Sequence, residues 1–183
     1  MKESRFTTRD LAFIGMTLAL MYIVQTITIL GVSALTPFDA AKSIVSAFFV
    51  SIVIAIGLAK VGKIGTFTII GIINGIICGF ILPAFLPLLP TTILGGIAAD
   101  GVTKLLYGEY GSRNSLVTAC GVNQLVMTVV ILTIPLLFGF STMILSPGII
   151  IVSALLCGGL GAAGGLVGSK IVDELIKAGA ITD

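Results

Sequence analysis

Long uncharged stretches alternate with short charged ones along this chain. Four runs contain no Asp, Glu, Lys or Arg, namely residues 11–38, 43–59, 64–99 and 114–169. A helix needs about 20 apolar residues to cross a bilayer core about 30 Å thick. The first two runs fit one crossing each. Residues 64–99 would extend about 54 Å as one helix, which is too long for a single crossing.

Prolines divide the two longer runs. Three of them fall between residues 83 and 90, and Pro135 and Pro147 flank a second break. Proline lacks the backbone N–H and clashes with the preceding turn, so it ends or kinks a helix. The sequence therefore predicts a turn at residues 31–37 and six helices, at about residues 10–30, 37–59, 64–82, 88–106, 114–138 and 147–172.

Helix-start signals agree with this division. Thr7 with Asp10, and Thr36 with Asp39, have the spacing of a capping box, and Pro37 suits the first helical position. No stretch alternates with period two over the length of a barrel strand, and only helices or closed barrels satisfy the backbone in lipid. We predict an all-α fold, an integral membrane six-helix bundle that forms a single domain over residues 1–183.

Composition supports a lipid environment. Hydrophobic residues make up 57% of the chain and charged residues 10%, with a mean hydropathy of +1.21. Soluble domains carry about 25% charged residues, and a small one could not bury this much apolar surface. The basic residues form no cluster of the kind that binds nucleic acid. The first apolar stretch is too long for the core of a signal peptide and is interpreted as the first span.

The basic residues predict an orientation. Six crossings place both ends of the chain on one side, together with nine of the ten basic residues, and only Lys42 falls on the other side. Basic residues concentrate on the cytoplasmic side of membrane proteins. We therefore expect a multi-pass protein of the plasma membrane with cytoplasmic termini. The loops near residues 60–63 and 105–113 should be cytoplasmic, and those near 31–37, 82–90 and 139–146 should face outward.

Little in the chain suggests catalysis. Histidine and tryptophan are absent, and Cys78, Cys120 and Cys157 each stand alone in an apolar segment. No metal site, cofactor or nucleophile–base set is predicted, so we do not expect an enzyme. Asp100 is the one acid well inside a span, and Lys104 follows at the i+4 spacing of an ion pair. We favour that pair near the cytoplasmic end of the helix, with a functional role as the alternative.

Small residues form stripes on three predicted helices. Glycines recur every four residues from Gly71 to Gly79. Two further stripes are candidate docking faces for a partner subunit, and they comprise Ala12, Gly15 and Ala19 in the first helix and Gly158, Gly161, Gly165 and Gly168 in the last. Small residues let helices approach closely in lipid, either inside one protein or between subunits. The sequence leaves both uses open.

Aromatic and polar residues gather at the predicted outer ends of the helices. The candidate substrate-binding residues are Gln25, Phe38, Asp39, Lys42, Phe80, Phe85, Thr91, Thr92, Phe138 and Phe140. Aromatic walls with a few polar groups suit a small-molecule pocket, and an interfacial aromatic belt with helix caps is the alternative. Lys42 could pair with Asp39 or with an anionic ligand. The amides of Asn74, Asn123 and Gln124 are interpreted first as interhelical hydrogen-bonding groups.

Three segments carry a family resemblance. TTRDLAFIGMTLALMYIV, GGIAADGVTKLLYGEYGSRNS and GGLGAAGGLVGSKIVDELIKAGA resemble the MptD, or Trep-Strep, group of predicted substrate-binding S components of energy-coupling factor (ECF) transporters. The resemblance implies capture of a vitamin or other micronutrient from outside. It also implies a membrane coupling subunit (the T component) and two cytoplasmic ATPase subunits, which drive toppling of the S component and inward release.

The resemblance also bears on single residues. S components dock through two alanines four residues apart in the first helix, and the nearest match here is Gly15 with Ala19, with Ala12 one turn earlier. Nickel and cobalt S components use an N-terminal histidine, which this chain lacks. The alternative function is a stand-alone small secondary carrier or channel, for which an internal repeat and a continuous polar path would be expected.

Overall fold

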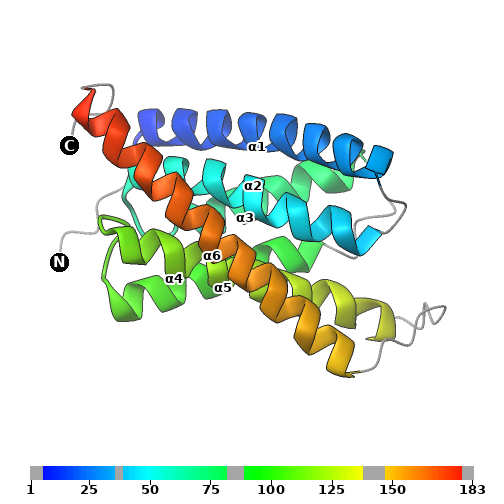
Figure 1. The fold of residues 1–183 in the computed structure, drawn as a ribbon. Coiled ribbons are helices and arrows are strands. Elements are labelled where there is room, and N and C mark those ends of the chain that lie inside the picture. The colour runs from blue at the N-terminus through cyan, green and yellow to red at the C-terminus, as the bar shows by residue number, and fades with distance from the viewer. Residues whose placement is uncertain (1–5, 36–38, 82–88, 138–146, 179–183) are drawn as a thin grey trace.

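The computed structural model describes residues 6–35, 39–81, 89–137 and 147–178, and all regular structure within these ranges is helical. The predicted fold class, an all-α membrane bundle, is confirmed. The start of α1 and the end of α6 lie at the same end of the bundle (Figure 1). The six helices are α1 (Thr8–Leu35), α2 (Asp39–Val61), α3 (Thr66–Ile81), α4 (Leu89–Leu106), α5 (Arg113–Leu137) and α6 (Pro147–Lys177).

Two helices, α1 and α6, extend five residues beyond their predicted C-terminal ends. Helix α1 continues to Leu35, so the turn predicted to begin at residue 31 is wrong for residues 31–35. No proline occurs before Pro37, and lipid favours a backbone that satisfies its own hydrogen bonds. Helix α6 continues past residue 172 to Lys177, whose ammonium lies 3.0 Å from the carboxylate of Glu174.

The helices differ in their capacity to cross a bilayer. Among the described residues, α1, α2, α5 and α6 contain segments long and apolar enough to do so. Helices α3 and α4 have 16 and 18 residues, which correspond to about 24 and 27 Å. Large apolar side chains cover much of the outer surface, as expected where lipid is the solvent. Crossing by α3 and α4 remains a prediction.

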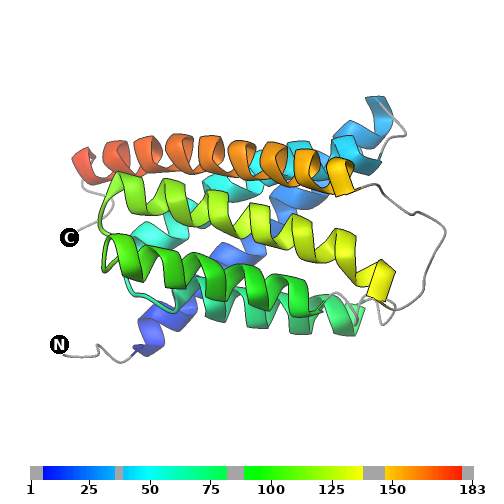
Figure 2. The ribbon, with the colours of Figure 1, turned by 90° about the horizontal axis from the view of Figure 1, so that it is seen from below.

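The helices are arranged as a ring with one loose side. The closely packed neighbours are α1 with α2, α2 with α6, α6 with α5, α5 with α4, and α4 with α3. Helix α3 contacts α1 and α2 much less, so the ring closes loosely there. Helix α6 crosses the bundle obliquely in Figure 1, and Figure 2 shows α5 running beside it.

The glycine stripe of α6 is used inside the bundle. A Cβ atom added to Gly158 would lie 3.1 Å from Cβ of Leu125, and one added to Gly161 would lie 2.6 Å from Cγ of Gln124. Both contacts are with α5, and Gly165 also packs on α5. Gly168 packs on α2. The assignment of these glycines as a face for a partner subunit is corrected, because the protein's own helices occupy it.

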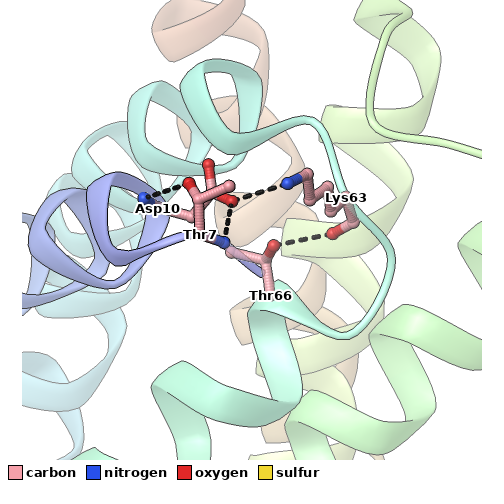
Figure 3. Close-up of polar contacts among 4 residues, drawn as sticks. All are labelled: Thr7, Asp10, Lys63 and Thr66. Carbon is pink, nitrogen blue, oxygen red and sulfur yellow. Dashed lines mark hydrogen bonds and ion pairs between the residues drawn. The ribbon is translucent and has the colours of Figure 1, made fainter. Parts of the chain in front are cut away.

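Arg9, Lys60 and Lys63 lie at the end of the bundle where α1 begins and α2 ends, here called the basic end. At this end α1 starts with its predicted cap (Figure 3). The backbone N–H of Thr7 donates to Oδ2 of Asp10 at 2.7 Å, and the N–H of Asp10 donates to the Thr7 hydroxyl at 3.3 Å. Lys63, between α2 and α3, pairs with the same Asp10 oxygen at 2.6 Å. Its carbonyl accepts a 2.6 Å bond from the Thr66 hydroxyl at the start of α3. The capping-box prediction for Thr7 is confirmed, whereas that for Thr36 lies outside the described residues.

Candidate functional site

A cavity of about 290 Å³ lies within the ring of helices. All six helices contribute to its wall, so it is a property of the whole bundle and not of one helix pair. Its apolar wall consists of Met21, Ile44, Ala47, Val50, Ile54, Phe67, Ile70, Gly71, Met127, Ile131, Leu132 and Cys157. Its polar wall consists of Gln25, Ser46, Asn74, Thr92, Asn123, Gln124, Thr128 and Ser153.

The cavity lies mainly away from the basic end. Thr92 is near the start of α4, Ser153 is near the start of α6, and Ile44 is near the start of α2. These three helix starts are at the end opposite to the start of α1. Residues 36–38, 82–88 and 138–146, which precede these three helices in the sequence, lie outside the described residues.

Four carboxamides distinguish the polar wall. Gln25, Asn74, Asn123 and Gln124 each carry one, and none of the described residues that line the cavity is charged. A carboxamide both donates and accepts hydrogen bonds without a formal charge. In a low-dielectric cavity an unpaired charge is costly, so this wall suits an uncharged molecule that has its own donors and acceptors.

Asn74 is held by a second helix. The hydroxyl of Tyr22 on α1 donates to Oδ1 of Asn74 on α3 at 2.5 Å, and the same hydroxyl is 3.3 Å from Sγ of Cys78. The amide oxygen of Asn74 is therefore engaged, and its NH₂ group has no partner among the described residues. Asn74 is thus arranged to offer donors to a ligand in the cavity.

The two amides of α5 show the opposite pattern. The NH₂ group of Asn123 lies 3.5 Å from Sδ of Met127, and that of Gln124 lies 3.5 Å from the Ser51 hydroxyl of α2. Their side-chain amide oxygens have no hydrogen-bond partner in the described part of the chain. The cavity wall therefore combines donors from α3 with acceptors from α5, which suits a ligand with both kinds of group on different edges.

The predicted substrate-binding residues are only partly brought together. Gln25 and Thr92 line the cavity, and the Thr92 hydroxyl donates to the carbonyl of Gly71 at 2.9 Å. Thr91 is buried without lining the cavity, and Lys42 is half-buried in α2 but outside the lining. Phe80 is 84% exposed on the surface of α3, so its assignment to the pocket is corrected.

The other predicted pocket residues lie outside the described part of the structure. They are Phe38, Phe85, Phe138 and Phe140, together with the side chain of Asp39. The sequence predicts interhelical hydrogen bonds for Asn74, Asn123 and Gln124 and does not place them in the pocket. The signal for them was three carboxamides in otherwise apolar helices, but their convergence on one cavity depends on packing between helices distant in sequence.

The small-residue face of α1 is on the outer surface. Ala12, Gly15 and Ala19 are all exposed, and nothing lies within 4 Å of a Cβ atom added to Gly15. This face differs from the glycine stripe of α6, which the bundle itself occupies. Its use as a docking face for another protein stays a prediction.

Asp100 has different partners from the predicted one. It is 5% exposed, and its carboxylate accepts bonds from the N–H and hydroxyl of Thr68 at 2.7 and 2.6 Å. The hydroxyl of Tyr110, in the connection between α4 and α5, donates to it at 2.6 Å. Lys104 is exposed and forms no ion pair with it, so the predicted pair is corrected. Asp100 joins α4 to α3 and to the following connection.

Tyr110 is almost completely enclosed, with 1% exposure. Its backbone N–H also donates to the carbonyl of Gly62 at 3.3 Å, linking the two connections at the basic end. Burial, and then the nearby Asp100 carboxylate, raise the pKa of Tyr110 above its usual range, since both disfavour the phenolate. Together Asp100 and Tyr110 form a structural tie, and neither residue lines the cavity.

The described residues of the cavity wall carry amide, hydroxyl, thiol and apolar groups. Among the described residues, no group of three or more His, Cys, Asp or Glu side chains could hold a metal ion. The cysteines of the described region are free, and Cys157 in the cavity wall is buried.

Comparison with known proteins identifies a family. The family model described as hypothetical bacterial integral membrane protein (Trep_Strep) matches residues 8–144. No curated protein and no solved structure matches the chain. The matched segment includes α1 to α5, and with them most of the cavity wall and the exposed face of α1.

Proposed function

The chain belongs to the Trep_Strep family of bacterial integral membrane proteins, and we propose that it is the substrate-binding S subunit of an ECF-type importer. In this proposal the cavity within the ring holds a small uncharged micronutrient, such as a vitamin. The protein captures the solute at the outer surface of the plasma membrane and releases it inward. Both termini are cytoplasmic in this arrangement.

The cavity carries the proposal. A space of about 290 Å³ is at the lower end of the range for ligand pockets, so it suits a small molecule. Its carboxamides provide directional recognition without charge, and its apolar wall provides shape. A cavity lined by every helix would also make ligand capture sensitive to small shifts between helices, as a transport cycle requires.

The exposed face of α1 supports a partner subunit. Ala12, Gly15 and Ala19 would allow a second helix to approach closely, which is how helices associate in lipid. In the proposal this face contacts the T component. Transport then depends on two separate ATPase subunits that drive toppling of the S subunit against the T component.

The test is copurification followed by identification of bound solute. The full chain would be expressed together with candidate coupling and ATPase subunits encoded in the same genome and purified through a tag on this chain. We expect the T component and both ATPases to be retained, and mass spectrometry of the denatured complex to release one small molecule. The double variant Gln25→Leu with Asn74→Leu should lose the molecule but keep the subunits.

A stand-alone carrier or channel predicts the opposite result. The purified chain in liposomes would then move a solute or ions without ATP or other subunits. That outcome, with no retained subunit, would reject the importer proposal. Retained subunits without any bound molecule in several growth media would reject the cavity as the substrate site while leaving the docking assignment in place.

A further inference from the structure

A second hollow of about 270 Å³ lies on the outer surface between α1 and α2. It is separate from the cavity within the ring and shares no lining residue with it. It is lined by Arg9, Phe13, Met16, Thr17, Leu20, Val53, Ile56, Gly57 and Lys60. None of the small residues of the exposed α1 face lines this groove.

Its two ends differ in chemistry. Arg9 and Lys60 lie at the basic end, where the Arg9 guanidinium is 5.7 Å and the Lys60 ammonium 5.6 Å from the centre of the Phe13 ring. The two cations therefore converge on one ring, from different helices. Farther along, the groove is bounded by Met16, Leu20, Val53 and Ile56, which are apolar.

The two cations have no acidic partner in the described part of the chain. The nearby carboxylate of Asp10 pairs with Lys63 at 2.6 Å. Arg9 and Lys60 thus leave a local positive charge at the mouth of the groove that an anion could neutralise. The Phe13 ring, which both cations approach at cation–π distance, keeps the two charges close enough together for one anion to bridge them.

The length of the groove is close to the thickness of the hydrocarbon layer in one bilayer leaflet. From Arg9 to Leu20 the helix rises about 16 Å, and half of a bilayer core is about 15 Å. Close approach of α1 and α2 forms its floor, since a Cβ atom on Gly57 would lie 2.5 Å from the Thr17 side chain. A polar mouth and an apolar groove of this length match a headgroup with its acyl chain.

We propose that this groove binds an anionic phospholipid, with the phosphate between Arg9 and Lys60 and an acyl chain along Met16, Leu20 and Val53. The bound lipid would come from the leaflet at the basic end of the bundle. Basic pockets between membrane helices are known to select such headgroups. The proposal does not depend on the importer function.

Native mass spectrometry of the full chain tests the proposal. The protein in detergent is mixed with dioleoyl phosphatidylglycerol or with dioleoyl phosphatidylcholine, which carry identical acyl chains. We expect clear preference for phosphatidylglycerol. The double variant R9Q/K60Q should reduce this preference by about fivefold for each charge removed. The charge-conserving variant R9K/K60R should retain it.

The control variant is K104Q/K170Q, which removes two exposed cations that do not line the groove. It should retain the preference. Equal loss in both double variants would overturn the proposal in favour of diffuse attraction to the basic end, and an unchanged preference in R9Q/K60Q would overturn it outright. Competition by soluble glycerol 3-phosphate would indicate an anion site without a lipid. Loss of a copurified subunit in R9Q/K60Q, with no lipid preference in the parent protein, would assign the groove to a protein partner.

Discussion

The hydroxyl of Tyr22 donates a 2.5 Å hydrogen bond to Oδ1 of Asn74, across the loosely closed side of the helix ring. Tyr22 belongs to α1, which carries the exposed small-residue face, and Asn74 belongs to the wall of the cavity. Because the bond engages the side-chain oxygen of Asn74, the NH₂ group is the part of the amide that is left free. A ligand that accepts from Asn74 would therefore depend on the position of α1.

Tyr22→Phe tests this dependence. The variant keeps the ring but frees the amide of Asn74 to rotate, so ligand affinity should fall about two- to tenfold, the usual value of one hydrogen bond. The measurement is the amount of the small molecule retained per mole of purified protein. Tyr107→Phe is the matched control, because the Tyr107 hydroxyl contacts Thr118 outside the cavity. Equal retention by both variants would show that Tyr22 does not control the site.

Gly15→Leu should prevent assembly with the T component and leave folding intact. Nothing lies within 4 Å of a Cβ atom at this position, so the larger side chain extends outward and blocks close helix contact. The control is Gly159→Leu on α6, which is equally open. Copurification of the coupling subunit is the measurement. Unchanged recovery with Gly15→Leu would contradict the docking assignment.

Gly168→Val should destabilise the protein itself. A Cβ atom there would lie 2.7 Å from Cβ of Ala55 and 2.8 Å from the carbonyl oxygen of Ile52, and backbone cannot yield as a flexible side chain can. Overpacking of this kind costs about 1–3 kcal/mol. Thermal unfolding, monitored by size-exclusion chromatography, should have a lower midpoint for Gly168→Val than for Gly159→Val. Equal midpoints would mean that the α6 glycines do not hold the bundle together.

Asp100→Asn should lower stability by about 1–3 kcal/mol. The carboxylate accepts three hydrogen bonds from Thr68 and Tyr110. In asparagine one of the two oxygens is replaced by an NH₂ group, which cannot accept the hydrogen bond donated to that position. Lys104→Gln should have little effect, since Lys104 is exposed and does not pair with Asp100. The midpoint of thermal unfolding in detergent distinguishes the two. A large effect of Lys104→Gln would restore the ion pair that the sequence suggested.

Tyr110 should make stability dependent on alkaline pH. The unfolded chain releases this proton near pH 10, the ordinary value for tyrosine, whereas the folded protein retains it. The stabilising contribution is therefore complete below about pH 10 and declines as pH rises further. Raising the pH from 9 to 11 should lower the unfolding midpoint more for the parent protein than for Tyr110→Phe. Parallel decreases would indicate that other groups cause the whole effect.

The sequence alone determined the class of protein and the position of its helices. The long uncharged runs require lipid as the solvent, and prolines near residues 83–90 and 135–147 divide them, because both effects act locally along the chain. The cap at Thr7 and Asp10 follows from residues three apart. Family membership could likewise be recognised from local segments, and the match over residues 8–144 confirms it.

Tertiary structure decided which surfaces are internal and which are free. Two stripes of small residues look alike in sequence, yet the α6 glycines pack inside the bundle and the α1 face does not. Lipid and protein interior are both apolar, so hydrophobic pattern hardly distinguishes the two sides of a membrane helix. The hydrogen-bond partners of Asp100 depend on contacts between segments distant in sequence, and so does the position of Asn74 and Gln124 at one cavity. The order of the helices around the ring determines these contacts.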